Sequence, residues 1–496
     1  MKKPFLCLVI SGPSIHEARE QIKKASQFAD VLEFRLDLFN FKKTDAIRHL
    51  LEATKCRVMF TLRHRSQGGE YSGDQLMRYE QIRTLARLQP DYLDIEYDVI
   101  DELFVEVAQI APNTEVICSY HDFESTPQEL DLILEAMMMK KAAIYKLATM
   151  ANTINDSMRM LNFLKKNLKK KVRIAGICLG KKGECTRILA PVFGSAITFA
   201  TITEELKTAP GQLTADILLN IYRFHQLNPD TDIYGLIGDP VSRSTGHLFH
   251  NRFYREHNIN AVYVRFPVGS DEAHQFMQYA KKLHFRGLSV TMPLKEWILS
   301  ELDLATDDVN EIGACNTIVF EDKKLLGCNT DGLGAVQALE KYTSIAGKHV
   351  VVIGAGGTAK AVIYVLKQKG AFVTIVNRTL QKAEQLAEQF SAKARLLNNF
   401  ASVAEEGYDI LINATPIGMF TEKETLPIPA DKLLPDRIVM DIAHNPKETP
   451  LLREAKKRGC TPVLGSEMFE LQAEQQLNTW FSDHFVDRID KEQVEV

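Results

Sequence analysis

Eight short apolar runs recur through the first 205 residues, and their spacing constrains the fold more than any other feature of the chain. They occupy residues 5–11, 31–37, 57–63, 92–97, 115–122, 142–149, 172–180 and 196–202. Amphipathic stretches such as IHEAREQIKKASQFA (15–29) and PQELDLILEAMMM (127–139) lie between most of them. Strands that alternate with helices form a parallel sheet. Eight such units in roughly 225 residues predict a (β/α)8 barrel.

Polar residues gather where these predicted strands end. They are Glu33, Arg35, Arg63, Glu96, His121, Asp122 and Lys146, with Arg187 after the seventh strand and Gln212 after the eighth. In (β/α)8 barrels the active site lies at the C-terminal ends of the strands. Ordinary loop charges would account for one or two of these positions but not for the set, so the pattern predicts an active site.

The run AAIYKLAT (142–149) contains one charged residue, Lys146, in an otherwise apolar or small stretch. Burying an ammonium costs free energy unless it is paired. A desolvated lysine has a lowered pKa and, as the neutral amine, can attack a carbonyl to form a Schiff base. His121 could then remove a proton, and the arginines could bind a carboxylate. These residues predict an elimination or aldol-type reaction on a keto acid and leave dehydratase and aldolase open.

Five motifs resolve that choice by resemblance. EFRLD, FTLRHRSQGGEYSG, SYHDF, IYKLAT and TAPGQ resemble type I 3-dehydroquinate dehydratase over most of residues 1–215. The resemblance implies that Lys146 forms a Schiff base with the 3-keto group and that His121 transfers protons. It implies substrate binding by Glu33, Arg35, Arg63, Arg187, Thr208 and Gln212. Thr208 replaces the usual serine, and Gln67 stands where a carboxylate is common.

A glycine-rich turn lies in HVVVIGAGGTAKAVIYVLKQKGAFVTIVNRT (349–379), which reads as strand, turn, helix and strand. Such a turn lets a pyrophosphate approach backbone N–H groups at a helix N-terminus. The predicted contacts there are Gly354, Ala355, Gly356, Gly357, Thr358 and Ala359. The second strand ends without the carboxylate typical of NAD enzymes. Asn377, Arg378, Thr379 and Lys382 follow instead, and these cations predict NADP.

The segments around this unit resemble shikimate dehydrogenase over residues 233–490. They are GDPVSRSTGHLFHN, LSVTMPLKEW, GACNTIV, GCNTDGLGA, INATPIGM and GSEMFELQ. The resemblance implies that Lys295 and Asp331 form the catalytic pair. It implies shikimate binding by Ser244, Thr291, Asn316 and Gln472, and places Thr415 and Gly465 beside the cofactor. Three positions depart from the usual pattern of that family. Gly246 stands where the family has the second serine of its first motif, Ser289 where bacterial members often have asparagine, and His444 where tyrosine is usual.

The predicted architecture is therefore an N-terminal barrel followed by a two-lobed α/β dehydrogenase with a Rossmann NADP domain. The expected boundaries are 1–224 for the barrel, 225–232 for a linker, 233–335 for the shikimate-binding domain, completed by helices in 465–490, and 336–464 for the NADP domain. The net charge of −4, the eight cysteines without metal-ligand spacing and the short first apolar run favour a cytoplasmic protein without metal, membrane or nucleic-acid partners.

The functional hypothesis is a bifunctional enzyme. Its first half would dehydrate 3-dehydroquinate to 3-dehydroshikimate. Its second half would then use NADPH to reduce 3-dehydroshikimate to shikimate. One alternative is a ligand-sensing regulator, which should have lost Lys146, Lys295 or Asp331. Another is a dehydrogenase half that acts on quinate with NAD, against which Arg378 and Lys382 argue. The oligomeric state stays open.

Overall fold

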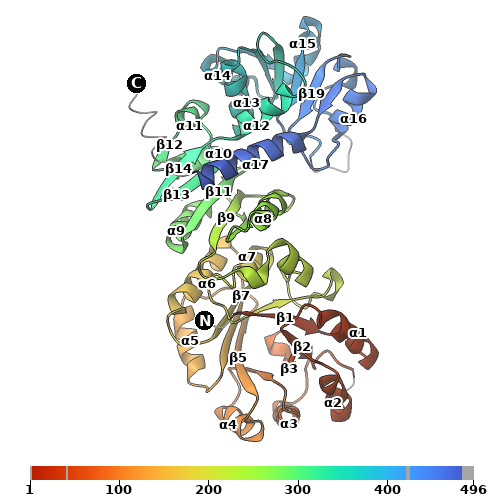
Figure 1. The fold of residues 1–496 in the computed structure, drawn as a ribbon, viewed down its shortest axis with the longest axis vertical. Coiled ribbons are helices and arrows are strands. Elements are labelled where there is room, and N and C mark those ends of the chain that lie inside the picture. Colours follow the sequence, from red (N-terminus) through yellow and green to blue (C-terminus); the bar gives the residue numbers. More distant parts are fainter. Residues whose placement is uncertain (1–2, 41–42, 420–424, 483–496) are drawn as a thin grey trace. The chain divides into compact units, whose positions relative to one another are not determined.

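The computed structural model describes residues 3–40, 43–419 and 425–482 (Figure 1). Two compact units make up the chain: residues 1–233 with 251–284, and residues 234–250 with 285–496. The domain boundaries expected from the sequence stay predictions, and residues 483–490 of the expected C-terminal helices lie outside the described residues. In the described part of the chain, no helix is both long enough and apolar enough to cross a membrane.

The first sheet has eight parallel strands and forms a nearly closed barrel, which confirms the prediction. The strands are β1 (Phe5–Ile10), β2 (Val31–Arg35), β3 (Arg57–Thr61), β4 (Tyr92–Glu96), β5 (Glu115–Asp122), β6 (Ile144–Met150), β7 (Ile174–Leu179) and β8 (Ile197–Ala200). Their order is β7-β6-β5-β4-β3-β2-β1-β8. At the two ends of this order, the N–H of Ala196 donates to the carbonyl of Ile174 at 2.6 Å.

The barrel interior is built in layers because successive strand residues face opposite sides. One buried apolar cluster takes a residue from every strand: Cys7, Val31, Met59, Tyr92, Ile117, Ile144, Ala175, Ile177, Ile197 and Phe199. The residues two positions further along several strands therefore form the next layer. That layer contains Glu33, Thr61, Asp94, Ser119 and Lys146, all buried. The same alternation that fills the core thus sets a polar layer above it.

Helices follow most of the barrel strands. They are α1 (Ile15–Ala25), α2 (Thr44–Glu52), α3 (Gln75–Ala86), α4 (Asp101–Ile110), α5 (Leu130–Met138), α6 (Ile154–Asn167) and α7 (Glu184–Ile188). Short 3-10 helices are η1 (Arg65–Gln67), η2 (Lys181–Gly183), η3 (Glu204–Leu206) and η5 (Phe224–Gln226), and η4 (Ile217–Ile221) is a π-helix. Ser14 and Glu17 form a capping box that starts α1, and Thr153 and Asp156 do the same for α6. Each box satisfies backbone N–H groups that a helix start leaves unpaired.

The second sheet has six strands in the order β10-β9-β11-β13-β14-β12. These are β9 (Asp232–Gly238), β10 (Ala261–Pro267), β11 (Phe285–Val290), β12 (Leu304–Ala305), β13 (Thr317–Glu321) and β14 (Lys324–Cys328). The accompanying helices are α8 (Gly246–Glu256), α9 (Ala273–Leu283), α10 (Leu294–Trp297), η6 (Ile298–Glu301), α11 (Asp307–Ile312) and α12 (Asp331–Glu340). This topology places Lys295 in the short helix after β11 and Asp331 at the first position of α12, after β14.

The third sheet is parallel, with the order β17-β16-β15-β18-β19-β20. Its strands are β15 (His349–Ile353), β16 (Phe372–Asn377), β17 (Lys393–Leu396), β18 (Ile410–Asn413), β19 (Ile438–Asp441) and β20 (Thr461–Val463). The helices are α13 (Gly357–Gln368), α14 (Leu380–Gln389), α15 (Phe400–Glu406), α16 (Pro450–Lys457) and α17 (Gly465–Phe481), with η7 (Leu397–Asn399) and η8 (Ala430–Lys432). The strand–turn–helix–strand prediction for 349–379 is confirmed.

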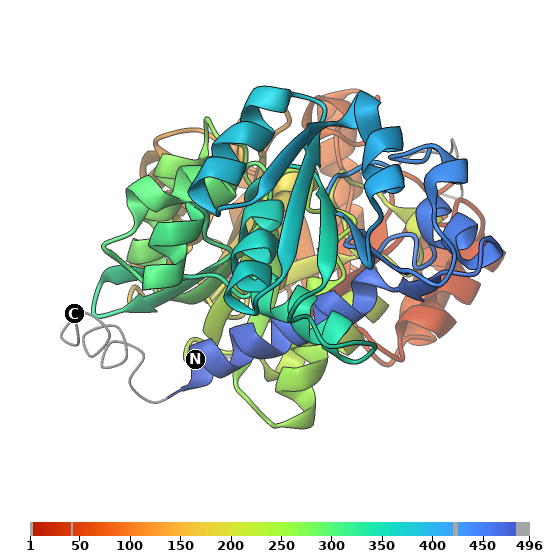
Figure 2. The same cartoon turned by 90° about the horizontal axis from the view of Figure 1, so that it is seen from above.

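Helices cover both faces of this third sheet (Figure 2). Val350 and Val352 pack in a cluster with residues of α12, α13 and α14, whereas Val351 and Ile353 pack with residues of α15 and α16. The chain order reverses at β15, because β16 follows on one side and β18 lies on the other. Open α/β sheets bind ligands at such a switch point, so the C-terminal end of β15 is the expected nucleotide site.

Candidate active sites

The C-terminal ends of the barrel strands surround a cavity with about 570 Å³ of empty space, part of it open to solvent. Its lining includes every barrel residue that the resemblance selects: Glu33, Arg35, Arg63, His121, Lys146, Arg187, Thr208 and Gln212. Gln67 lines it too. Two further residues that the sequence pattern selects, Glu96 and Asp122, are not among the lining residues. Asp122 instead accepts hydrogen bonds from the backbone N–H groups of Glu124 and Ser125, at 2.9 and 2.8 Å, and so orders the turn after β5.

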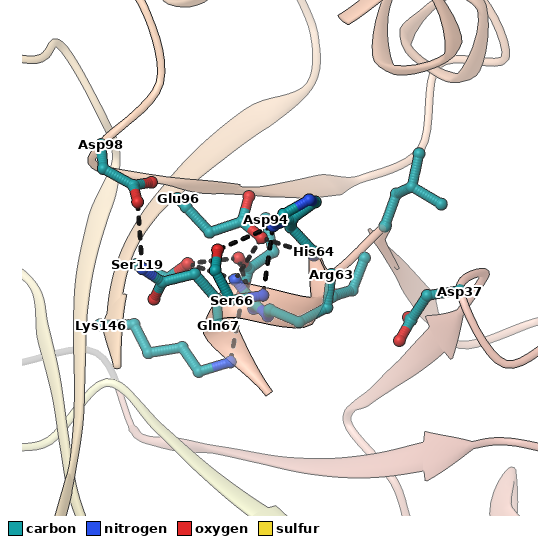
Figure 3. A network of polar contacts seen from close by, with 12 residues as sticks. Asp37, Arg63, His64, Ser66, Gln67, Asp94, Glu96, Asp98, Ser119 and Lys146 are labelled. Atoms are coloured by element: carbon teal, nitrogen blue, oxygen red, sulfur yellow. Dashed lines mark hydrogen bonds and ion pairs between the residues drawn. The ribbon is translucent and has the colours of Figure 1, made fainter. Parts of the chain in front are cut away.

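Lys146 projects from β6 into this cavity and is only 6% exposed. Its Nζ lies 3.1 Å from Oδ2 of Asp94 on β4 (Figure 3). It also lies 4.3 Å from the centre of the Phe199 ring. A carboxylate and an aromatic face both offset the cost of desolvating an ammonium. An otherwise apolar strand can therefore hold a lysine, because the buried ammonium is paired with a carboxylate and lies against an aromatic ring.

Asp94 connects three side chains of the polar layer. Its Oδ1 accepts a hydrogen bond from Arg63 at 2.8 Å and another from the Ser119 hydroxyl at 2.6 Å. Burial alone would raise the pKa of Asp94, but Arg63 and Lys146 hold that pKa well below its ordinary value. The carboxylate therefore stays ionised. The sequence prediction missed Asp94, although a charged residue in the apolar run YLDIEY, two positions before Glu96, is the same signal that identified Lys146.

Arg63 is held by a second carboxylate. Its guanidinium lies 3.3 Å from Glu96 and donates to the Ser119 hydroxyl at 2.8 Å. Glu96 is in turn ion-paired with Arg78, a buried residue of α3 that the sequence prediction also missed. Burial opposes the charge of Arg63, but Asp94 and Glu96 raise the pKa of Arg63 above its ordinary value. The guanidinium is therefore a fixed cation at the cavity wall.

Glu33 and Arg35 reach the same cavity from β2. Glu33 accepts a hydrogen bond from the Thr61 hydroxyl at 2.7 Å. Arg35 donates to both oxygens of Asp37, at 3.0 and 2.7 Å, and Asp37 also accepts from the backbone N–H of Glu70 at 3.1 Å. Asp37 thus ties the Arg35 side chain to the loop after β3.

His121, near the end of β5, lies parallel to the Phe123 ring, with 6.0 Å between ring centroids. Its Nδ1 is buried and has no hydrogen-bond partner among the described residues. Burial lowers the pKa of His121 well below its ordinary value, and Arg63 and Lys146 lower it further. The imidazole is therefore neutral at physiological pH and able to accept a proton.

The opposite wall of the cavity comes from the segments after β7 and β8. Arg187 donates to the carbonyl of Phe199 at 3.0 Å, and burial lowers its pKa to about 10. The Oε1 of Gln212 accepts from the backbone N–H of Thr208 at 2.9 Å, which orders the loop between them. Gly211 has φ of +71°, and a Cβ there would lie 2.1 Å from the Gly180 carbonyl oxygen, so only glycine fits this loop.

Gln67 lies at the cavity mouth, where the resemblance leads one to expect a carboxylate. Its Nε2 donates to Asp98 at 3.1 Å, and its Oε1 is buried without a hydrogen-bond partner among the described residues. A carboxylate at this position would face Asp98 with the same charge. The amide therefore suits this neighbour, which the sequence pattern alone did not reveal.

A second polar cluster surrounds Lys295 in the second unit. The ammonium is ion-paired with Asp331 and donates to the Thr358 hydroxyl at 2.8 Å. The other carboxylate oxygen of Asp331 accepts from the Asn316 amide at 2.9 Å. That amide also lies 2.9 Å from the Thr330 hydroxyl and 3.3 Å from Oε1 of Gln472. Four predicted site residues, Lys295, Asn316, Asp331 and Gln472, are therefore brought into one network.

Ser244 and Thr291 have backbone contacts in the structure. The Ser244 hydroxyl accepts from the N–H of Gly246 at 3.2 Å, and the N–H of Thr291 donates to the carbonyl of Ile237 at 2.9 Å. Their roles toward a substrate stay predictions. Ser289 donates to the buried Gln476 at 2.8 Å. Gln476, one helical turn beyond Gln472 on α17, was missed by the sequence prediction and anchors this helix to the second sheet.

His444 stacks on the Phe469 ring, with centroids 5.0 Å apart. Its Nε2 is buried and has no hydrogen-bond partner among the described residues. Burial lowers the pKa of His444. The imidazole is therefore neutral at physiological pH.

The glycine-rich turn lies between β15 and α13, as predicted. Gly354 has φ of +121°, and a Cβ there would approach the Ala414 carbonyl oxygen to 2.9 Å. Gly356 caps α13, and a Cβ at Gly356 would meet open space. The first turn of α13 thus presents free backbone N–H groups to a space that a phosphate could fill. Ala355 is half-buried here, whereas Ala359 is buried in the core beneath the turn.

The remaining predicted nucleotide residues lie at neighbouring strand ends. Arg378 and Lys382 are exposed and have no ion pair among the described residues. Asn377 donates to the carbonyl of Thr379 at 3.0 Å. The Thr415 hydroxyl donates to Oδ1 of Asn413 at 2.7 Å, in the loop that contacts Gly354. A separate constraint applies to Gly465, where a Cβ would lie 2.4 Å from the Ala443 carbonyl oxygen and no other residue fits.

The residues present fit NADP. Two unpaired cations stand where a 2′-phosphate would lie, and a glycine turn opens onto a helix N-terminus at the switch point of a parallel sheet. No group of three or more potential metal ligands occurs within residues 3–40, 43–419 and 425–482.

The fold and the two sites define a fusion of a (β/α)8 barrel enzyme with a dinucleotide-dependent dehydrogenase. Three family models match: Type I 3-dehydroquinase over residues 6–229, the shikimate dehydrogenase substrate binding domain over 236–318, and Shikimate / quinate 5-dehydrogenase over 336–449. The chain belongs to the family of bifunctional 3-dehydroquinate dehydratase/shikimate dehydrogenases.

Relatives that span the whole chain and a relative that matches only its second half both support this assignment. The chain is 36% identical to the Arabidopsis thaliana protein named bifunctional 3-dehydroquinate dehydratase/shikimate dehydrogenase, chloroplastic, over 96% of this chain and 82% of that one. It is 35% identical to the shikimate biosynthesis protein AroDE of Chlamydia pneumoniae, over 97% and 96%. Its second half is 40% identical to the shikimate dehydrogenase (NADP(+)) of Pyrococcus furiosus, over 51% and 92%. Because the plant relative is named as chloroplastic, a cytoplasmic location stays a prediction.

Proposed function

We propose that this bifunctional enzyme uses its barrel for the Schiff-base dehydration of 3-dehydroquinate and its second half for the NADPH-dependent reduction of 3-dehydroshikimate to shikimate. The observation that carries the proposal is the presence of both sets of reactive groups in one chain. A buried, paired lysine shares a cavity with a neutral histidine, and a second lysine–aspartate pair lies against the first turn of the nucleotide-binding helix.

In the barrel, Lys146 is the nucleophile. The ammonium first loses a proton, and the neutral amine then adds to the 3-keto group, so that a C=N bond replaces C=O and one water is released. Asp94 stabilises the ammonium before this step and the iminium after it, since its carboxylate stays ionised. The iminium withdraws electrons from the neighbouring carbon, which acidifies the C–H bond there.

His121 moves the protons of the elimination. As a neutral imidazole it takes the proton from that carbon, and it returns this proton to the departing hydroxyl, which leaves as water. Hydrolysis of the imine regenerates the Lys146 amine. Arg63, Arg187 and Gln212 line the same cavity and supply donors for the carboxylate and hydroxyl groups of the substrate.

A pH profile tests the neutral imidazole. We expect kcat/KM for dehydration to show no acid limb from His121 between about pH 6 and 8, because burial, Arg63 and Lys146 lower its pKa well below 6.5. The free enzyme then holds the imidazole in its basic form across this window. An acid limb with a midpoint near 6.5 that is absent from His121→Gln would contradict the assignment.

In the second half, Lys295 and Asp331 act at the reacting ketone. NADPH, when bound, supplies a hydride to the carbonyl carbon. The Lys295 ammonium stabilises the charge that develops on the oxygen and donates a proton to it. Asp331 orients the ammonium and hydrogen-bonds the hydroxyl that forms. Asn316 donates to the other oxygen of Asp331, and its amide also contacts Gln472; both belong to the polar network at this site and are proposed to bind the substrate polyol.

The cofactor preference rests on Arg378 and Lys382. We expect the double substitution Arg378→Ala, Lys382→Ala to raise KM for NADPH by about 100-fold and that for NADH by less than about 3-fold. Charge-assisted hydrogen bonds contribute roughly 1.5–3 kcal/mol each, and only NADPH carries the 2′-phosphate. Steady-state kinetics with both cofactors gives the result, and Lys456→Ala, an exposed lysine on α16, is the matched control. Equal losses with the two cofactors would assign these cations another role.

One coupled assay tests the whole proposal. The purified chain is given 3-dehydroquinate and NADPH, and NADPH loss is followed alongside shikimate formation. We expect one shikimate for each NADPH consumed. A chain that binds these ligands without turnover would be a sensor, and a chain that prefers quinate and NAD would be a quinate dehydrogenase. Either outcome would refute the assignment of the second half.

A further inference from the structure

Thr358 contacts the Lys295–Asp331 pair directly. Its hydroxyl oxygen accepts a hydrogen bond from Nζ of Lys295 at 2.8 Å and lies 3.4 Å from Oδ2 of Asp331. Thr358 is the second residue of α13, the helix whose first turn forms the predicted nucleotide site. The three side chains come from three different helices, α10, α12 and α13. The sequence prediction assigns Thr358 to the cofactor, and in the structure its hydroxyl also contacts the reacting pair.

The backbone is built for this contact. A Cβ on Gly357 would lie 3.1 Å from Cβ of Lys295 and 3.3 Å from Cβ of Ala314. Glycine at this position therefore lets the first turn of α13 pack closely against the lysine side chain. Without that approach, a short hydroxyl on the neighbouring residue could not reach Nζ.

An ammonium has three N–H groups and no acceptor. In this site Asp331 takes one of them and Thr358 takes a second. The third is then fixed in direction, because rotation about the Cε–Nζ bond would break both existing hydrogen bonds. A single fixed donor aimed at the oxygen of a bound ketone is the arrangement that stabilises charge developing there.

We propose that Thr358 is a positioning residue of the dehydrogenase half, whose hydroxyl fixes the Lys295 ammonium so that its third N–H points at the substrate carbonyl. The inference rests on the proposed reduction by Lys295 and Asp331. Thr358 acts through Lys295 and forms no bond to substrate. Because Thr358 sits on the nucleotide-binding helix, the same contact links the position of that helix to the orientation of the lysine.

The test compares Thr358→Val, which keeps the shape and removes the hydroxyl, with Thr358→Ser, which keeps the hydroxyl. We expect Thr358→Val to lower kcat for reduction of 3-dehydroshikimate by about 10- to 100-fold, with KM for NADPH within about 2-fold of the wild type. Thr358→Ser should retain kcat within about 3-fold. Thr374→Val, a half-buried threonine of β16 outside both sites, is the matched control.

An unchanged KM for NADPH shows that the second unit is folded, and dehydratase activity of the same sample, which reports the barrel, should be unchanged in all variants. A Thr358→Val variant with normal kcat would overturn the inference, as would one whose loss appears only in KM for NADPH, which would make Thr358 a cofactor ligand. An equal loss in Thr358→Ser would also overturn it. A wild-type chain that fails to reduce 3-dehydroshikimate would instead refute the proposed function, which keeps the two failures distinct.

Discussion

We expect Lys146→Ala to lower the dehydratase kcat by more than about 10⁴-fold and to leave NADPH-dependent reduction of 3-dehydroshikimate unchanged. Removing the nucleophile of a covalent mechanism removes the pathway itself, so the loss should approach the largest seen for single catalytic residues. The two reactions are measured separately on one preparation, with 3-dehydroquinate or with 3-dehydroshikimate and NADPH. The retained reductase then shows that the second unit is folded and that the loss is confined to the barrel.

Borohydride trapping identifies the atom that reacts. Reduction of the iminium in the presence of 3-dehydroquinate should add a stable mass to the peptide that contains Lys146, and to no other. Lys141→Ala, an exposed lysine shortly before β6, is the matched control and should be labelled and active like the wild type. An adduct at another lysine, or full activity without any adduct, would rule out the Schiff-base assignment.

We expect Lys295→Ala to lower kcat for the reduction by about 10²- to 10⁴-fold, with a smaller change in KM for 3-dehydroshikimate. The ammonium interacts most strongly with the charge that forms in the transition state, so its removal affects kcat more than binding. Asp331→Asn should impair the same step, because it removes the carboxylate that holds the ammonium in place.

The double variant reports whether the two residues act as one unit. We expect Lys295→Ala with Asp331→Asn to be little worse than the more damaged single variant, since Asp331 works through Lys295. Steady-state kinetics of the two single variants and the double variant completes the cycle, and the dehydratase serves as the folding control. Strictly multiplicative losses would show independent roles and contradict the pair.

Much of the architecture follows from residue periodicity. Apolar runs of six to nine residues, most of them separated by amphipathic stretches, predict the eight barrel strands, and the structure has a strand that overlaps each run. Polar residues at the ends of those runs predict the cavity lining, including Lys146, His121 and Arg187. The glycine turn before α13 is predictable because a positive φ at Gly354 and a close backbone approach both require glycine.

The partners of these residues are less predictable. Asp94 lies 52 positions before Lys146 in the chain, and Glu96 pairs with Arg78 on α3, one of the helices that surround the barrel strands. Periodicity tells which face of a strand a side chain occupies, and so Asp94 and Lys146 share the interior. It does not tell which two interior residues come within hydrogen-bond distance, because that depends on how far neighbouring strands are staggered.

The sequence by itself determined the element types, the two-part organisation and the chemical groups available at each site, because these depend on local spacing and composition. Only the tertiary structure decided that the Lys146 ammonium is balanced by Asp94, that His121 is neutral, and that Thr358 contacts Lys295. The physical reason is common to all three. Electrostatic and hydrogen-bond interactions depend on distances between atoms and on burial, and folding sets both by joining segments that lie far apart in the chain.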